Sequence, residues 1–285
     1  MTPLLYIAVF AATLALGRRI RLNIEPALSA SVYLVVFTVG FWGASVIVGR
    51  AAASLLGKAL LYLALTTLYT VALGLAAEGR EKEWRGGGEA PVPWRIWLVV
   101  VSGFLTGSVL KAPSTVPLGR LIDGEVLALI SLAGLDTARR VEIDVFRKSL
   151  AVTVKSCVIA LAAGALAAAS ASVIIGTPLR VSLLYTWGMG WYSFSGPFAA
   201  SHIGVEEGLS IFIVNLLREQ LVFLLVPLLR RPFIGLLALG GATTMDNTLP
   251  IYVAVYGEEA AIPSVSNGVA LTLVTPFLLA AALSL

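Results

Sequence analysis

The sequence predicts an all-α polytopic membrane protein with about eight transmembrane helices and two interrupted apolar segments. Hydrophobic residues make up 58% of the 285 positions and charged residues only 13%, against roughly 25% charged in a typical soluble domain. A soluble protein needs polar side chains over its surface, so this composition excludes a water-soluble globule. Cys157 is the only cysteine and His202 the only histidine, which excludes disulfides within the chain, cysteine clusters and multi-histidine metal sites. We therefore expect no metal and no cofactor.

Eight apolar runs account for the predicted transmembrane helices, since about 20 apolar residues are needed to cross the hydrocarbon core. They are Pro3–Gly17, Ala27–Gly49, Ala59–Ala77, Ile96–Leu110, Pro117–Leu135, Ser149–Ile175, Gly208–Leu229 and Ile262–Ser284. The first run is predicted as a span and not as a cleavable leader, because its positive charges, Arg18, Arg19 and Arg21, follow the apolar residues instead of preceding them.

Two further apolar segments do not fit a simple span. Thr177–Val205 contains the Gly- and Ser-rich stretch Gly188–Pro197, and Pro232–Gly257 contains the stretch Gly240–Pro250. Glycine and proline interrupt helices. An interrupted backbone at membrane depth persists only where protein or a water-filled cavity satisfies its polar groups. These segments are therefore predicted to be either re-entrant hairpins or discontinuous helices.

The placement of positive charge favours a topology with both termini outside the cytoplasm, because cytoplasmic loops are enriched in Lys and Arg. Treating both interrupted segments as hairpins places more Lys and Arg inside than full crossing of both would. The predicted parts are residues 1–77, a three-helix scaffold repeat; 78–95, a cytoplasmic linker; 96–176, a second, inverted three-helix repeat; and 177–285, a transport region.

Internal similarity supports this division. Gly40 and Gly134 lie in similar apolar surroundings, each in the second helix of a three-helix group. A sharper repeat joins the two interrupted segments: Glu206, Glu207 and Asn215 recur 52 positions later as Glu258, Glu259 and Asn267. Inverted repeats with interrupted helices are typical of secondary transporters, which bind substrate where the repeats meet.

The span Gly208–Leu229 carries the polar residues Asn215, Arg218 and Glu219. Glu219 lies near its centre, where an ionisable group costs about 2.5–3.5 kcal/mol on insertion scales and usually faces a cavity or a partner. Arg218 and Glu219 are adjacent and point about 100° apart on a helix, so they do not simply neutralise each other. The alternative role is packing against polar groups of other helices. Asp123 and Glu125, near the end of another span, are expected to be interfacial.

The second interrupted segment places Thr243, Thr244, Asp246 and Asn247 at its centre. There Asp246 could bind a cationic amino group. It could equally cap the helix that follows, because Asp is a favoured N-cap residue.

The first interrupted segment centres on Trp191, Tyr192, Ser193 and Ser195. Serine hydroxyls and helix N-termini suit a carboxylate, and the aromatic rings could lie over an ammonium group. The alternative is a belt of aromatic residues at the membrane interface.

Three motifs together resemble those of the prokaryotic lysine exporters of the LysO type. They are Gly190–Gly196, Asn215–Glu219 and Gly241–Pro250, all in the last third of the chain. The resemblance implies export of L-lysine, and of analogues such as thialysine, across the cytoplasmic membrane by antiport with a cation. The proton is the expected coupling cation. It implicates Glu219 and Asp246 as the proton-coupling acids. The expected partners are lysine, protons and the lipid bilayer, with a homodimer possible and no nucleic acid.

Two other functional classes are alternatives. A transporter of another amino acid, an organic anion or an ion would use the same repeat plan, with Arg218 and the serine-rich segment dominating. An intramembrane enzyme would need a nucleophile with a base, or paired acids. Because His202 is the only histidine and lies near a predicted loop, we do not expect an enzyme.

Overall fold

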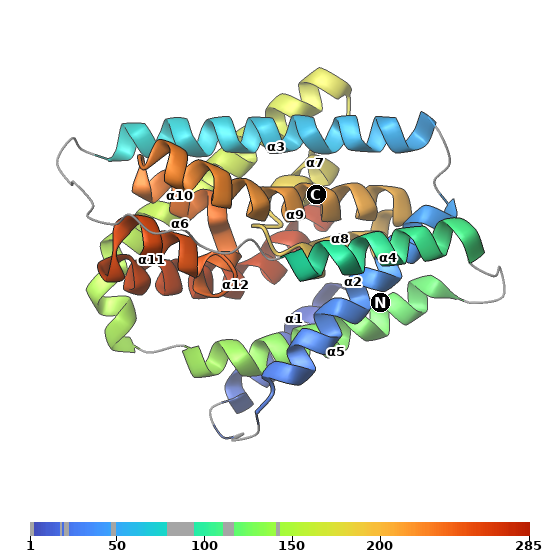
Figure 1. The fold of residues 1–285 in the computed structure, drawn as a ribbon, viewed down its shortest axis with the longest axis horizontal. Coiled ribbons are helices and arrows are strands. Elements are labelled where there is room, and N and C mark those ends of the chain that lie inside the picture. Colours follow the sequence, from blue (N-terminus) through green and yellow to red (C-terminus); the bar gives the residue numbers. More distant parts are fainter. Residues whose placement is uncertain are drawn as a thin grey trace. The chain divides into compact units, whose positions relative to one another are not determined.

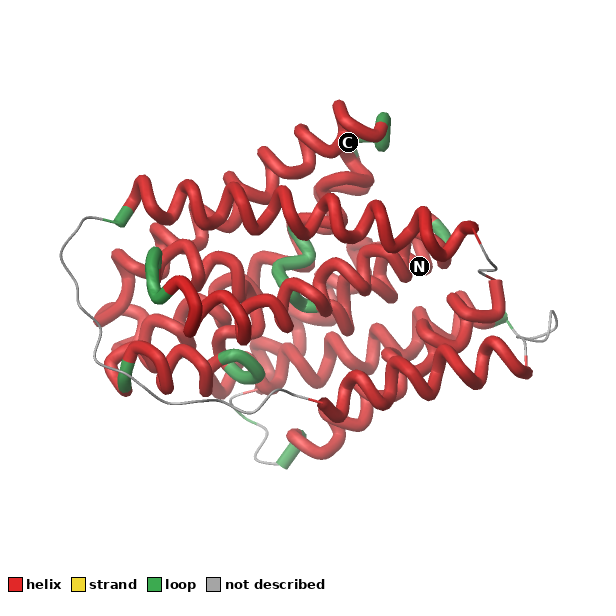
Figure 2. The backbone as a smooth tube through the Cα atoms, turned by 45° about the horizontal axis from the view of Figure 1, so that its top comes forward, coloured by secondary structure: helices red, strands yellow, loops and turns green. Residues whose placement is uncertain are grey.

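A computed structural model describes residues 3–17, 19, 23–46, 50–78, 94–110, 117–140 and 143–285. Within these ranges Figure 2 shows helices joined by short loops, with no strand. The all-helical prediction is confirmed for this part of the chain. Most of the predicted linker 78–95 lies outside the described residues.

The helices follow one another along the chain as labelled in Figure 1. They are α1 (Pro3–Gly17), α2 (Glu25–Val46), α3 (Arg50–Ala77), α4 (Trp94–Leu110), α5 (Leu118–Arg140), α6 (Ile143–Ile175), α7 (Leu179–Thr186), α8 (Tyr192–Ile203), α9 (Val205–Leu229), α10 (Phe233–Gly240), the 3-10 helix η1 (Gly241–Met245), α11 (Leu249–Tyr256), the 3-10 helix η2 (Glu258–Ala260) and α12 (Ala261–Ser284). Both segments predicted to be interrupted are interrupted, between α7 and α8 and between α10 and α11. Helices α3 and α6 begin earlier than predicted, because a helix can continue beyond its apolar run.

Among the described residues, five helices are long and apolar enough to cross a membrane: α2, α3, α6, α9 and α12. Helices α1, α4 and α10 contain shorter apolar stretches. Helix α5 carries Arg120, Asp123 and Glu125 in its first half. The protein is thus an α-helical, multi-pass membrane protein by helix length and composition. The count of eight spans stays a prediction.

The chain forms two compact units, each assembled from segments distant in the sequence. The first unit comprises Met1–Ala59, Pro93–Arg139 and Tyr192–Ile213, and the second comprises Leu60–Val92, Arg140–Trp191 and Val214–Leu285. Helices α3 and α9 contribute residues to both. The division into two scaffold repeats and a transport region stays a prediction.

Close helix contacts in the first unit depend on glycine. A Cβ atom at Gly103 of α4 would lie 2.6 Å from the carbonyl oxygen of Phe37 on α2, and one at Gly40 of α2 would lie 3.2 Å from the carbonyl oxygen of Val100. Gly134 of α5 meets the backbone of Phe10 on α1 in the same way. Small residues allow the backbones of membrane helices to approach closely. Both glycines of the weak sequence repeat therefore mark helix contacts.

Helix α5 carries two acids that neighbouring helices cover. Asp123 and Glu125 are buried, each with 8% of its surface exposed, and their interfacial depth stays a prediction. The Tyr6 hydroxyl of α1 donates to Asp123 at 2.8 Å, and the Thr38 hydroxyl of α2 lies 2.9 Å from Glu125. These acids lie near the start of α5, as the sequence predicts, and they face neighbouring helices.

In the second unit, α10, η1 and α11 form an antiparallel hairpin. The Tyr252 hydroxyl of α11 donates to the Leu236 carbonyl of α10 at 2.5 Å. The rings of Phe233, at the start of α10, and Tyr256, at the end of α11, lie 4.8 Å apart. Each arm has eight residues, or about 12 Å of helix, far short of the roughly 30 Å hydrocarbon core. The second interrupted segment therefore folds back on itself as a helical hairpin, and its path relative to the membrane stays a prediction.

Helices α7 and α10 are the first arms of the two interrupted segments. They contact the chain near the two ends of the stretch of α3 that lies in the second unit, residues 60–77. The Tyr62 hydroxyl lies 2.7 Å from the Ser182 hydroxyl of α7. Glu78, directly after α3, accepts a hydrogen bond of 2.8 Å from the backbone N–H of Phe233 at the start of α10. These contacts are separated by about 24 Å of helix.

Candidate functional site

The two helix breaks meet within the second unit. The backbone N–H of Ala242 donates to the Met189 carbonyl at 2.8 Å. Gly241, with φ of 63°, packs so closely on that carbonyl that a side chain there would overlap it. Met189, 52 positions earlier, also has a positive φ, of 51°. Positive φ favours glycine, and the matching conformations extend the sequence repeat to the backbone.

Two asparagines support the breaks from the long helices. The Asn215 side-chain amide of α9 donates to the Tyr185 carbonyl at 3.4 Å, and that of Asn267 on α12 donates to the Leu237 carbonyl at 3.1 Å. Tyr185 and Leu237 are themselves 52 positions apart. Each asparagine thus holds the first arm that precedes it, so the offset found in the sequence corresponds to an equivalent contact.

Arg218 joins the C-terminal ends of two arms. Its guanidinium donates to the carbonyls of Leu239 at 2.7 Å, Ala238 at 2.8 Å and Thr186 at 3.0 Å. These carbonyls belong to the last turns of α10 and α7, where helix dipoles concentrate negative charge. Only 1% of Arg218 is exposed. Its remaining contact is to the Met189 sulfur at 3.9 Å, so substrate binding by this side chain stays a prediction.

Glu219 points to different partners, as its position on the helix predicts. Its side chain is fully buried. One carboxyl oxygen accepts a 3.2 Å hydrogen bond from the Gln220 side chain, and the other accepts one of 3.2 Å from the Asn247 side chain. Both donors are neutral amides, so the hydrogen bonds do not supply a compensating positive charge. An acid buried in this way is a functional candidate.

The tip of the hairpin connects this buried acid to the surface. Asp246 and Asn247 are both exposed. The Asn247 backbone N–H donates to the Asp246 carboxyl at 2.6 Å, while its side chain reaches Glu219. Three of the predicted site residues are therefore brought together: an exposed acid, a bridging amide and a buried acid.

Thr243 and Thr244 use their hydroxyls to hold the tip. The Thr243 hydroxyl donates to the Gly240 carbonyl at 2.9 Å, and the Thr244 hydroxyl lies 2.8 Å from the Ser264 carbonyl of α12. The Asn267 side chain donates to the Thr244 hydroxyl at 3.0 Å. These contacts explain the shape of the tip, and binding of substrate by either threonine stays a prediction.

The predicted residues of the first interrupted segment are divided between the units. Trp191 belongs to the second unit, and Tyr192, Ser193 and Ser195 belong to the first. The Tyr192 ring packs edge-on against Phe212, with centroids 5.6 Å apart, and is 5% exposed. A buried ring does not fit the alternative of an interfacial belt for Tyr192. Both serines are buried as well, and their role in binding stays a prediction.

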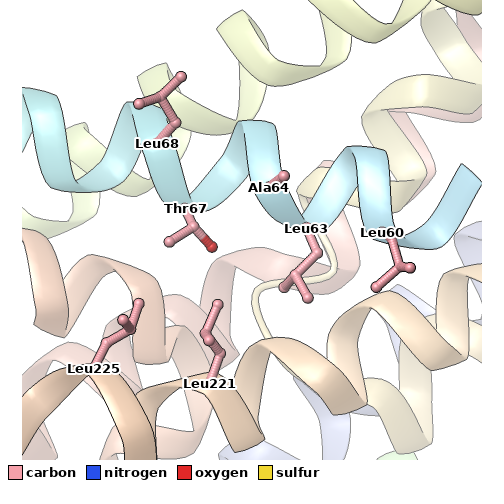
Figure 3. Close-up of a pocket in the computed structure, with 7 residues that line it drawn as sticks. All are labelled: Leu60, Leu63, Ala64, Thr67, Leu68, Leu221 and Leu225. Carbon is pink, nitrogen blue, oxygen red and sulfur yellow. The ribbon is translucent and has the colours of Figure 1, made fainter. Parts of the chain in front are cut away.

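An apolar groove lies elsewhere in the second unit, between α3 and α9 (Figure 3). It is lined by Leu60, Leu63, Ala64, Thr67, Leu68, Leu221 and Leu225. No charged side chain lines it, so it does not suit a charged amino acid. Among the described residues we take the hairpin tip and Glu219, not this groove, as the candidate site.

Two residues that hold the candidate site and the hairpin were not predicted from the sequence. Gln220 hydrogen-bonds Glu219, and Glu78 hydrogen-bonds the start of α10. The only available signal for Gln220 was its place beside an intramembrane acid. No local pattern predicts the contact of Glu78, because its partner is 155 positions away.

The fold and the site define an α-helical membrane protein whose interrupted helices meet beside a buried acid. A family model described as "Lysine exporter LysO" matches residues 97–283, so the chain belongs to this family, and the predicted resemblance is confirmed. The chain is 35% identical over 108 residues to "Lysine exporter LysO" of Escherichia coli (strain K12), which is 38% of this chain and 36% of the relative. It is 32% identical over 106 residues to "Putative lysine exporter" of Haemophilus influenzae (strain ATCC 51907 / DSM 11121 / KW20 / Rd), which is 37% of this chain and 54% of the relative.

These matches cover only about a third to a half of the two relatives' lengths. The description of the family names an exporter, which agrees with the prediction of a transport protein and not an enzyme.

Proposed function

We propose that the protein is a secondary active transporter that exports L-lysine, and analogues such as thialysine, across the cytoplasmic membrane by antiport with protons. Membership of the family and the names of the two relatives support lysine as the substrate. The observation that carries the proposal is the fully buried Glu219 carboxyl, linked by Asn247 to a tip on which Asp246 is exposed.

The chemistry of lysine fits two acids of different exposure. Lysine carries two ammonium groups, and exposed Asp246 is suited to attract one of them from water. An ionised Glu219 must be paired with a cation, because an isolated buried charge is costly. Either a proton or an ammonium group neutralises Glu219, and exchange of one for the other at this carboxyl couples lysine to protons.

An inverted-repeat arrangement is part of the proposal. It is supported by α7 and α10. Ser182 of α7 contacts Tyr62 of α3, Phe233 of α10 contacts Glu78 just after α3, and the C-terminal ends of both arms share Arg218. Secondary transporters commonly pair inverted, interrupted helices in this way and move them to alternate access. We propose that both chain termini lie outside, as the charge distribution favours.

The alternative substrate class, an organic anion, depends on Arg218. The guanidinium of Arg218 is buried and donates to three backbone carbonyls. The groups at the exposed tip are acidic or neutral instead. This arrangement favours a cationic substrate over an anionic one.

The test is uptake and efflux of radiolabelled lysine in liposomes that contain the purified protein, with an imposed pH gradient. We expect the gradient to drive lysine transport, Glu219→Gln to abolish it, and Asp246→Asn to raise the lysine concentration needed for half-maximal rate. Glu207→Gln is the matched control, since Glu207 forms a partly exposed ion pair with Lys58 in the first unit. Undiminished gradient-driven transport by both acid variants would refute the assignment, and transport of citrate or glutamate in place of lysine would support the anion alternative.

A further inference from the structure

The first unit contains a buried carboxyl that the proposed mechanism does not use. Glu125 of α5 lies on the buried face of that helix with Ile122, Val126 and Leu129, which are 0% exposed. Residues three or four positions apart share a helix face, so Glu125 occupies a core position in an apolar row. A carboxyl there needs a reason beyond packing, since burial of an ionised acid is costly.

The hydrogen bonds around Glu125 fit the protonated acid better than the ion. The Thr38 hydroxyl lies 3.0 Å from the Leu34 carbonyl and 2.9 Å from the Glu125 Oε1. A hydroxyl has one hydrogen to donate, so Thr38 cannot fully satisfy both acceptors. A protonated Glu125 can donate its own hydrogen to the Thr38 oxygen, and Thr38 then donates to Leu34. Both contacts can then be full hydrogen bonds at the same time, whereas an ionised Glu125 must share the single Thr38 hydrogen with the Leu34 carbonyl.

In the part of the chain that the structure describes, Glu125 forms no ion pair. Among the described residues, the Glu125 Oε2 is buried without a hydrogen-bond partner. Asp123, two residues before Glu125, accepts a hydrogen bond from the Tyr6 hydroxyl of α1. The ring centroids of Tyr6 and His202 of α8 lie 5.9 Å apart.

The described titratable groups of α2 and α4 form no hydrogen bond or ion pair with Glu125. Those of α2 are Glu25 and Tyr33, towards its start, and the described part of α4 has Arg95 near its own start. Among the described groups of these helices, Thr38 is the polar side chain that contacts the Glu125 carboxyl.

We propose that Glu125 is a second proton-carrying residue of the transport cycle, distinct from Glu219. It holds a proton while it is bonded to Thr38, and it releases that proton when movement of α5 relative to α2 opens the site to water. This inference rests on the proposed function, because it assigns the residue a role in proton-coupled export.

Glu125→Gln separates this role from a structural one. Glutamine retains the shape of the side chain and the oxygen near Thr38, but it cannot release a proton. Glu125→Asp retains a titratable acid and should restore part of the coupling. Glu207→Gln is again the control, because it removes an acid of the same unit that is partly exposed and paired with Lys58.

Two readouts are compared in liposomes. One is net lysine flux driven by a pH gradient, and the other is exchange of labelled for unlabelled lysine without a gradient. Exchange does not require net proton movement, so Glu125→Gln should lose gradient-driven flux and keep exchange. Equal loss of both activities would indicate a structural role and overturn the inference, as would full retention of both.

Infrared spectroscopy gives a measurement that does not depend on transport. The wild-type protein at neutral pH should show protonated carboxylic acid absorption from which Glu125→Gln removes one component, whereas Glu207→Gln leaves the absorption unchanged and Glu219 accounts for what remains in Glu125→Gln. Carboxylic acid absorption in Glu125→Gln equal to that of the wild type would overturn the inference. A wild-type protein that moves no lysine would refute the proposed function and this role with it, whereas normal wild-type transport with unaltered Glu125→Gln refutes the role of Glu125 alone.

Discussion

Replacement of Arg218 by methionine should destabilise the second unit more than any exposed substitution. Methionine keeps an unbranched apolar stem and removes every donor of the guanidinium. The carbonyls of Leu239, Ala238 and Thr186 would then lose the hydrogen bonds that Arg218 provides. The C-terminal ends of α7 and α10, where these carbonyls lie, would also lose the positive charge that balances their helix dipoles.

The expected magnitude follows from these three contacts. A buried polar group that loses its partner costs about 1–3 kcal/mol, so three carbonyls cost about 3–9 kcal/mol together. This is a large share of the roughly 5–15 kcal/mol by which proteins are usually stable. Lysine keeps the positive charge but lacks the planar fork that reaches several acceptors at once. Arg218→Lys should therefore lie between wild type and Arg218→Met.

Thermal unfolding in detergent, followed by tryptophan fluorescence, measures the effect. A loss of 3 kcal/mol should lower the midpoint by about 6 °C or more, taking about 2 °C for each kcal/mol. Arg180→Met is the matched control, because Arg180 is exposed on α7 in the same unit. If Arg218→Met unfolds at the same temperature as Arg180→Met, the carbonyls do not depend on the guanidinium and the reasoning is wrong.

Two further predictions concern helix contacts. Gly103→Ala should destabilise the first unit by about 1–3 kcal/mol, because overpacking forces the backbone of α4 away from Phe37. Gly57→Ala is the control, since Gly57 has open space around it. Equal thermal midpoints for the two variants would contradict this prediction. Burial raises the pKa of Glu78 above its ordinary value of 4.5, although the hydrogen bond from Phe233 opposes the shift. Its stabilising contribution is therefore complete below pH 4.5 and is lost as pH rises through the raised value. Glu78→Gln should flatten this part of the pH–stability curve, and an identical curve for wild type and variant would show that Glu78 does not titrate there.

Local sequence patterns located the interrupted helices and most of the groups in the candidate site. Gly240 and Gly241 beside an apolar run predicted the break in the second segment, because glycine weakens a helix wherever it occurs. Glu219 stood out because an acid in an apolar helix is costly without a partner. The recurrence of Asn215 as Asn267 predicted a repeat, and their equivalent contacts with Tyr185 and Leu237 agree with it.

The partners of these residues could not be predicted in the same way. The three carbonyls bound by Arg218 lie in two arms that the sequence separates by some fifty positions, and backbone carbonyls are identical in every residue type. The burial of Glu125 depends on which face of α5 meets α2. That choice is made by the packing of whole helices.

Composition and periodicity settle the environment of this protein and the position of its helix breaks, since both depend on how each residue interacts with lipid, water and its own backbone. Only the folded chain decides which acid lies beside which donor. Hydrogen bonds such as that between Asn247 and Glu219 join residues 28 positions apart, and their formation requires the hairpin to close against α9. Short-range preferences specify the helices, whereas long-range packing brings their polar groups together.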